Sequence, residues 1–190
     1  MRAVEPVDRQ QVIISGVGGQ GVLFVTRLLA EVAIRSGRQV MSSETHGMAQ
    51  RGGVVVSHLK VGGFAGPLVR AGRADTMLVL KGDNLTLHRS FLRDNGWAVV
   101  NAPSPPENSG GTRVSCLDAD RLAKESGLLR GVNLITLGFL LAEGSSFPFF
   151  CTRDQVRSVL GSGRGRTAAD SLQALELGLI HGRKLYEEMG

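Results

Sequence analysis

Two glycine-rich segments in the first third of the chain constrain its fold more than any other feature. The first, residues 16–21, reads Gly-Val-Gly-Gly-Gln-Gly, follows the apolar run Val12-Ile13-Ile14 and precedes an amphipathic stretch. This order is typical of a strand that turns tightly into a helix and exposes backbone N–H groups to an anion. The second, residues 44–53, adds charge, imidazole and further glycines where the next strand is expected to end. Together the two segments predict an edge of a sheet that faces a ligand.

The length of the chain favours one domain. A chain of 190 residues can bury a substantial core but is too short for two comfortable ones, so we predict a single domain over residues 1–190. Its 26 glycines are well above the usual share of about 7%. Many backbone positions are therefore expected to form tight turns or close approaches.

The charge of the chain argues against nucleic acid as a ligand. The formal net charge is +5, but lysine and arginine are scattered, and there is only one tryptophan and one tyrosine for base stacking. A modest positive balance would equally suit a phosphorylated small ligand or an acidic protein partner such as a ferredoxin. We therefore expect no nucleic acid partner and leave these two ligand classes open.

The cysteines and the apolar runs indicate a cytoplasmic protein without a cluster of its own. Cys116 and Cys151 are isolated in sequence, so they form neither a CxxC metal pair nor a four-cysteine iron-sulfur set. Any iron-sulfur cluster must then lie on a partner. Residues 1–10 lack the apolar core of a secretory signal, and apolar runs such as residues 134–142 are too short to span a bilayer. We expect both thiols to be reduced.

Hydrophobic periodicity predicts alternating strands and helices. The expected strands are residues 11–15, 38–43, 54–60, 76–80, 97–100 and 113–117. The expected helices are a first one that begins at residue 22 and is ended by Gly37, and then residues 83–93, 118–126, 133–143, 152–160 and 167–188. This alternation favours a Rossmann-like three-layer α/β/α fold with a mostly parallel sheet and C-terminal helices, in which residues 54–60 lie inside the sheet.

The first glycine segment fits the pattern G-x-G-x-x-G between a strand and a helix. This context favours a phosphate or pyrophosphate at the helix N-terminus, although the glycines could instead serve only a sharp turn and close helix packing. The amide of Gln20 could exchange hydrogen bonds with such a ligand. The candidate binding residues here are Gly16, Gly18, Gly19, Gln20 and Gly21.

The second glycine segment offers further candidates. Glu44 lies at the expected end of the second strand, where a carboxylate contacts a ribose hydroxyl in dinucleotide-binding folds, which would indicate a free-standing nicotinamide or flavin oxidoreductase. The residues after it are more polar than ribose binding requires. Arg51 can offer a planar fork of donors to a phosphate or carboxylate, and Gly52 and Gly53 let a ligand approach the main chain. A surface charge is the alternative for Arg51.

The remaining polar residues do not indicate a metal site or a catalytic centre. His46 is read as a hydrogen-bonding or interface group, because no third ligand or nearby carboxylate spacing suggests zinc. The serines show no Gly-x-Ser-x-Gly elbow, so a hydrolase has no support. We therefore assign no catalytic residue and no metal ligand to this chain.

With both glycine segments in view, the sequence resembles the gamma-type subunits of 2-oxoacid:ferredoxin oxidoreductases, and within them the beta subunit of the indolepyruvate-type enzymes. The resemblance rests on residues 16–23, on residues 43–53 with Ser57-His58, and on shorter matches at Pro67-Leu68, residues 72–75 and Gly131-Val132-Asn133. It extends from about residue 11 to the C-terminal helix. The long second segment is far more specific than G-x-G-x-x-G.

The resemblance implies a subunit rather than a complete enzyme. Members of this family oxidatively decarboxylate a 2-oxoacid to an acyl-CoA and reduce ferredoxin, with thiamine diphosphate, magnesium and iron-sulfur clusters on partner subunits. For this chain it implies a cytoplasmic Rossmann-like subunit, inactive alone, that packs against the thiamine-bearing subunit and contacts coenzyme A. Glu44, His46 and Arg51 would be binding or interface groups. A scaffold subunit without a catalytic role is the alternative, and an isolated chain could self-associate through the surface meant for its partner.

Overall fold

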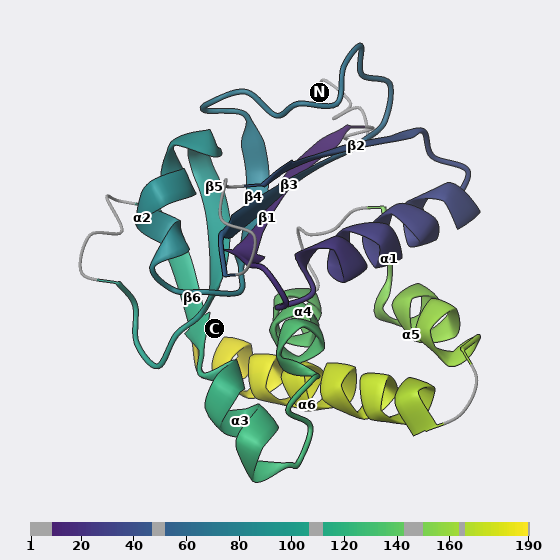
Figure 1. Cartoon of the computed structure of the whole chain (residues 1–190), viewed down its shortest axis with the longest axis vertical. Helices are drawn as coiled ribbons and strands as arrows, with labels where there is room; N and C mark the ends of the chain where they lie inside the picture. Colours follow the sequence, from purple (N-terminus) through teal and green to yellow (C-terminus); the bar gives the residue numbers. More distant parts are fainter. Residues whose placement is uncertain (1–8, 47–51, 107–111, 143–149, 164–165, 190) are drawn as a thin grey trace.

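A six-stranded mixed sheet forms the centre of the computed structural model, which describes residues 9–46, 52–106, 112–142, 150–163 and 166–189 (Figure 1). The strand order is β2-β3-β1-β4-β5-β6. The strands are β1 (Gln10–Val17), β2 (Val40–His46), β3 (Val54–Val61), β4 (Ala74–Val79), β5 (Leu92–Asn101) and β6 (Arg113–Leu117). The α/β class and the mostly parallel sheet expected from the sequence are confirmed.

One strand runs against the others. β1, β4, β5 and β6 are joined by parallel pairings, whereas β3 pairs antiparallel with both β1 and β2. The strand expected inside the sheet at residues 54–60 is therefore inside it, between β2 and β1. Its direction follows from the short connection to β2, because antiparallel neighbours can be joined by a hairpin while parallel ones need a long crossover.

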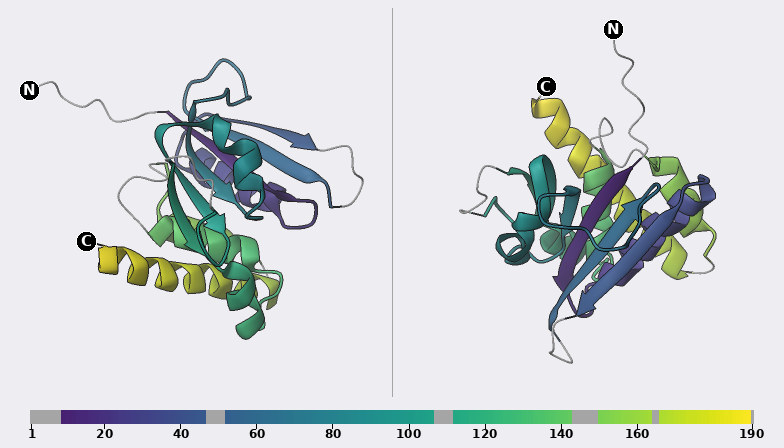
Figure 2. Two further views of the ribbon diagram at one scale, coloured as in Figure 1. Left: turned by 90° about the vertical axis from the view of Figure 1, so that its left-hand side faces the viewer. Right: turned by 90° about the horizontal axis from the view of Figure 1, so that it is seen from above.

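The helices are divided unequally between the two faces of the sheet. α1 (Val22–Arg35) and α4 (Val132–Ala142) cover one face, and α2 (Asn84–His88) with the 3-10 turn η1 (Arg89–Phe91) lies on the other (Figures 1 and 2). Alternate residues of β1 divide accordingly: Ile14 belongs to the larger core under α1 and α4, and Ile13 to the smaller one under α2. The remaining helices are α3 (Ala119–Glu125), α5 (Arg153–Gly161) and α6 (Arg166–Met189).

Helix α4 is the centre of the larger core. Residues 133–142 are all buried, because the sheet lies on one side of the helix and α6 on another (Figure 1). A helix that is apolar all round is expected in such a position. Glycines let α4 and α6 approach closely: a Cβ on Gly138 would run into the carbonyl oxygen of Leu175, and one on Gly178 into that of Ile135.

The predicted helix at residues 83–93 is too long. α2 ends at His88, η1 ends at Phe91, and β5 already begins at Leu92, which pairs with Ala74 of β4. Asn95, expected to stop a helix, has a left-handed φ of 64° within β5. The helical spacing of the apolar residues was outweighed by burial of Leu92 in the smaller core, a tertiary contact that periodicity does not report.

The sequence Thr152-Arg153-Asp154-Gln155 has the form of a capping box, and the structure confirms one at the start of α5. Thr152 Oγ1 accepts from the Gln155 N–H at 3.2 Å, and Gln155 Oε1 accepts from the Thr152 N–H at 2.8 Å. The next residue, Arg153, donates from Nε to Leu141 O at 3.0 Å and from Nη2 to Ala142 O at 2.8 Å. α5 thus begins where it satisfies the last carbonyls of α4.

Among the described residues, none of the helices combines the length and apolar character that crossing a membrane requires.

Candidate functional site at the carboxyl edge of the sheet

The first glycine segment connects β1 to α1 as expected. Gly18 and Gly19 are exposed, and positive φ angles occur at Gly19 (95°) and at Gly21 (81°), which is the N-cap of α1. Such angles are open to glycine and strained for other residues. Gly16, which is buried, has no room for a side chain, because a Cβ would lie 2.9 Å from Gln20 Oε1 and from Val22 Cγ2. The loop therefore contains both features considered for the motif: a tight turn, and exposed backbone that a ligand could approach.

The start of α1 presents backbone donors next to these exposed glycines. The first helical hydrogen bond runs from the Val25 N–H to Gly21 O at 3.1 Å, so the amides of residues 22–24 precede it. Gly21 supplies no side-chain cap, and no acidic residue lies in the first turn. The positive end of the helix dipole is therefore left without a local carboxylate, which is the arrangement that favours an anion.

Gln20 has a structural role that sequence reasoning missed. Its Oε1 accepts from the Val17 N–H at 2.9 Å, and its Nε2 donates to Leu80 O at 3.0 Å. The side chain thus closes the loop on itself and ties it to the end of β4. Contact between Gln20 and a ligand stays a prediction, and these bonds leave at most one amide proton for it.

The two glycine segments meet in space. The Gly18 N–H donates to Gly53 O at 3.0 Å, and Gly52 is exposed with a φ of 75°. Arg51 lies outside the described residues, and of His46 only the backbone is described, as the last residue of β2. Their binding roles remain predictions, but the main chain directly after the gap, at Gly53, contacts the first glycine loop.

Glu44 does not occupy the position of a ribose-binding carboxylate. It is an exposed residue of β2 and pairs with Ser57 of β3, so a whole strand separates it from β1. In dinucleotide-binding folds the second strand lies beside the first, which brings the acidic residue to the ligand. Sequence reasoning missed this because the hairpin partner of β2 is inserted between the two strands. Ligand contact by Glu44 stays untested.

Asparagine side chains hold the glycine loop from outside. Asn84 donates from Nδ2 to Gly16 O at 2.9 Å, and Asn133 donates to Gly21 O at a longer 3.5 Å. Asn101 Nδ2 donates to the same Leu80 carbonyl that Gln20 uses, at 3.1 Å. All three asparagines are buried. Of these, only Asn133 lay in a segment that the sequence singled out; Asn84 and Asn101 had no signal beyond following a strand.

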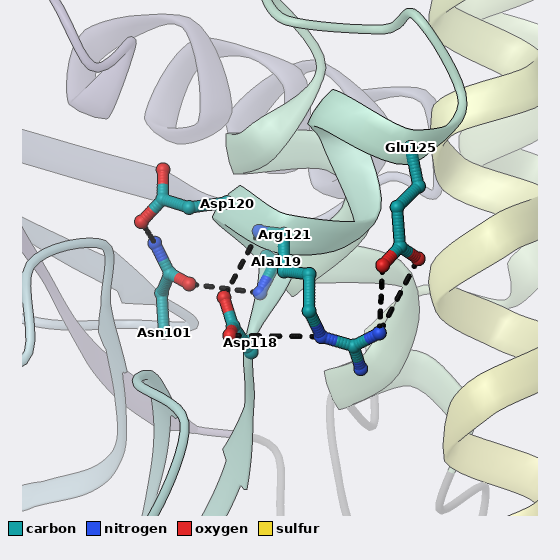
Figure 3. Close-up of polar contacts among 6 residues, drawn as sticks. All are labelled: Asn101, Asp118, Ala119, Asp120, Arg121 and Glu125. Carbon is teal, nitrogen blue, oxygen red and sulfur yellow. Dashed lines mark hydrogen bonds and ion pairs between the residues drawn. The ribbon is translucent and has the colours of Figure 1, made fainter.

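Asn101 also fixes the start of α3, as Figure 3 shows. Its Oδ1 accepts from the Ala119 N–H at 2.9 Å, and its Nδ2 donates to Asp120 Oδ2 at 2.8 Å. Asp118, the N-cap of α3, accepts from the Arg121 N–H at 2.9 Å. The ends of β4 and β5 are thereby joined to the helix that follows β6, and the carboxyl edge of the sheet becomes one connected hydrogen-bond network.

Two histidines lie under the face of the sheet that α2 covers. Ser15 Oγ accepts from Asn84 Nδ2 at 3.1 Å and shares a hydrogen bond with His88 Nδ1, 2.9 Å away. His58 Nδ1 accepts from the Val69 N–H at 3.2 Å. Burial lowers the pKa of both imidazoles, and the nearby charge of Lys60 lowers the pKa of His58 further. A hydrogen bond to the Asn84 backbone opposes this effect at His88. Burial therefore favours the neutral form of both rings.

Acid is expected to destabilise the protein through these two histidines. Because their folded pKa values lie below the ordinary 6.5, their contribution is complete above that pH and is lost as the pH falls through the folded values. Each ring can lower the free energy of unfolding by up to about 1.4 kcal/mol per pH unit there. Urea unfolding of the wild type and of His58→Gln between pH 7 and 5 would measure this. A wild-type stability that is flat over this range would contradict it.

The cysteines give no sign of redox or metal chemistry. Burial raises the pKa of Cys116 to about 11 and that of Cys151 further, so both remain thiols at neutral pH. Among the described residues, no group of three histidine, cysteine or acidic side chains could hold a metal ion. The residues present therefore do not fit an iron-sulfur cluster.

The sequence matches a known protein family and named relatives. Residues 11–180 match the model of the pyruvate ferredoxin/flavodoxin oxidoreductase family. The chain is 32% identical over 161 residues to the indolepyruvate oxidoreductase subunit IorB of Archaeoglobus fulgidus, which covers 74% of this chain and 80% of the relative. It is 30% identical over 191 residues to the IorB subunit of Thermococcus kodakarensis, covering 88% and 93%.

Solved structures share the fold at lower identity. The gamma subunit of a keto/oxoacid ferredoxin oxidoreductase from Geobacter sulfurreducens superposes with a TM-score of 0.71 at 19% identity, over 91% of this chain and 98% of that one. The 2-oxoglutarate:ferredoxin oxidoreductase of Magnetococcus marinus, with 2-oxoglutarate, coenzyme A and succinyl-CoA bound, gives 0.76 at 18% identity, over 93% of this chain but 31% of that one. The match over residues 11–180 shows that the chain belongs to the pyruvate ferredoxin/flavodoxin oxidoreductase family.

Proposed function

We propose that this chain is the gamma-type subunit of an indolepyruvate-type 2-oxoacid:ferredoxin oxidoreductase and is inactive on its own. The observation that carries the proposal is the length of the match: the chain covers 80% and 93% of two relatives that are themselves named subunits. In the reaction a 2-oxoacid and coenzyme A give an acyl-CoA, carbon dioxide, a proton and two electrons, and ferredoxin takes up the electrons. Thiamine diphosphate, magnesium and the iron-sulfur clusters would lie on the partner subunit.

Two features of the described residues support a subunit without its own redox group. The sequence has only two cysteines, both held as thiols. Insertion of β3 removes Glu44 from the place where it could bind the ribose of a nicotinamide or flavin dinucleotide. A free-standing dinucleotide-dependent oxidoreductase is therefore the weaker alternative, and a scaffold subunit without influence on catalysis is the other.

Within this function we propose that the carboxyl edge contacts the phosphate-bearing part of coenzyme A. The support is the exposed loop at Gly18 and Gly19, the uncapped start of α1 and the backbone of Gly52, which together offer donors and close approach. Beside this loop lies a cavity of about 510 Å³ between α1, the turn before α4 and the start of α6. Phe24 and Asn133 line it, and the latter also contacts Gly21.

Reconstitution tests the proposal. The purified chain should be colourless and inactive, and mixing it with a thiamine-containing partner subunit should restore reduction of a viologen dye that requires both indolepyruvate and coenzyme A. Tightly bound flavin or nicotinamide, with activity of the chain alone, would contradict the proposal. A partner that is fully active without this chain would support the scaffold alternative.

The same assay tests the coenzyme A contact. In the reconstituted enzyme, Gly19→Val should raise the KM for coenzyme A about tenfold, since one anion contact is worth about that much. Gly72→Val is the matched control: Gly72 also has a positive φ (67°) with open space around it, but it lies in the turn before β4. Equal KM values for the two variants would show that the glycine loop does not contact coenzyme A. The proposed role as a subunit would not be affected by that result.

A further inference from the structure

Three cations lie near one another at the end of the sheet opposite the glycine loop, and two of them lie over an aromatic ring. Arg9 directly precedes β1, Lys60 lies near the end of β3, and Arg70 belongs to the loop between β3 and β4. Phe64, in the same loop, lies between the first two: its ring centroid is 5.5 Å from Arg9 Cζ and 4.9 Å from Lys60 Nζ. We call this group the Phe64 cluster.

Strand pairing fixes the position of Lys60. It lies opposite Gln11 of β1 on one side and opposite Met41 of β2 on the other, so its side chain leaves the same face of the sheet as theirs. The loop after β3 returns over this face, because the Val69 N–H donates to His58 two residues away. The result is a lysine whose stem is covered and whose ammonium group lies over the Phe64 ring.

Lys60 is buried, and no acidic residue in the described part of the chain pairs with it. Only 8% of its surface is exposed, and within the described residues neither Lys60 nor Arg9 nor Arg70 forms an ion pair. Burial and the charge of Arg70 both lower the pKa of Lys60, so the fold places positive charges together at a cost. Buried lysines are ordinarily paired with a carboxylate.

The nearby carboxylate does not relieve this charge. Asp75 of β4 accepts from the Gln11 N–H at 2.7 Å with one oxygen and pairs with Arg93 Nε at 2.8 Å with the other. Both of its oxygens are therefore used on the far side of β1. Covering apolar surface with its stem would explain why Lys60 is a lysine with a buried chain. It does not explain why Arg9 shares the Phe64 ring with Lys60 and why the charge of Arg70 also lies near Lys60.

We propose that the Phe64 cluster binds a small, multiply charged anion that carries phosphate or carboxylate groups. Lys60 would donate a charge-assisted hydrogen bond, which is stronger than one between neutral groups. Arg9 and Arg70 are exposed and can supply planar forks of donors that match phosphate or carboxylate oxygens. The site is separate from the glycine loop and does not depend on the proposed function.

Lysine NMR with two anion probes tests this site directly. The sequence contains four lysines, so protein labelled with ¹³C at lysine Cε gives few signals, and the Lys60→Met variant identifies the one from Lys60. Inorganic pyrophosphate and citrate, each at about 10 mM, would largely occupy a site of millimolar Kd. Either probe is expected to move the Lys60 signal and to raise the pKa of Lys60 toward its ordinary value, because a bound anion favours the ammonium form.

The other lysines separate this result from binding elsewhere. Lys81 lies at the carboxyl edge near Asp83 and reports on the glycine loop, while Lys124 of α3 is exposed and serves as reference. Arg9→Gln and Arg70→Gln should each weaken the anion response of Lys60 about tenfold. A response to pyrophosphate alone, or to citrate alone, would identify the anion class. A Lys60 signal that neither probe moves would overturn the proposal, whatever Lys81 does.

Discussion

Replacing Gly178 by alanine is expected to lower the free energy of unfolding by about 3 kcal/mol or more, at the upper end of what overpacking costs. The added methyl group would meet the carbonyl oxygen of Ile135 and would lie 2.8 Å from Phe139 N, both backbone atoms of α4. Backbone within a helix cannot rotate away as a side chain can. α6 would have to move off α4, and the contact between them is the most extensive between any two helices described.

The surrounding residues prevent α6 from shifting to avoid this clash. Gly182, one turn further along α6, would run into Ala142, and Gly138 on α4 faces the backbone of Leu175. α4 itself is held by the sheet on its other side. Because interiors are packed at crystal-like density, a shift of α6 at one glycine opens voids at the others. Helix propensity would favour alanine by about 1 kcal/mol, which does not offset this loss.

Gly161→Ala provides the matched control for this experiment. Gly161 ends α5, and the nearest atom to its added Cβ would be Leu172 Cδ1 at 3.8 Å, an ordinary contact. We expect a change within about 1 kcal/mol, and toward greater stability if helix propensity decides. Thermal and urea unfolding of both variants would measure the difference. If Gly178→Ala were as stable as Gly161→Ala, the result would contradict the close approach of the α4 and α6 backbones described above.

Gly21→Ala should have the second largest effect on stability, a loss of about 2–3 kcal/mol. A φ of 81° strains alanine, which by itself costs about 1–2 kcal/mol. In addition, the new methyl group would collide with the amide of Asn133, which lies in the first turn of α4 and contacts the glycine loop. The buried amide would have to turn away from Gly21 O and lose its partner there.

Gly19→Ala separates the two causes. Gly19 has a comparable φ of 95° but no atom within 4 Å of the added Cβ. It should therefore show only the conformational cost of about 1–2 kcal/mol. The difference between the two variants in urea unfolding measures the contact with Asn133. Equal losses would mean that this asparagine gives way freely and does not support the loop.

The fold could be predicted from sequence where local patterns decide it. The strand, glycine turn and helix of residues 10–35 and the capping box at Thr152 depend on neighbours along the chain, and both were found. The end of α2 and the insertion of β3 between β2 and β1 depend on distant partners, Ala74 in one case and β1 in the other. Hydrophobic periodicity is silent on such contacts.

The site was predicted less completely for the same reason. The glycines that open the backbone were evident from their type, and the meeting of Gly18 with Gly53 followed the expectation that the two segments share one edge. The internal bonds of Gln20, and the asparagines that arrive from three other elements, could not be found from spacing. The sequence does not distinguish an amide side chain that binds a ligand from one that donates to a backbone carbonyl.

The bracing of the glycine loop has a thermodynamic consequence. Asn84 and Asn133 hold its carbonyls, and Gln20 closes it internally. A ligand that docks at this loop meets amides that are already oriented, so little conformational entropy is lost in ordering them. Association at this edge should then resemble rigid-body docking, with selectivity set by the shape of the incoming molecule and not by a rearrangement of the subunit.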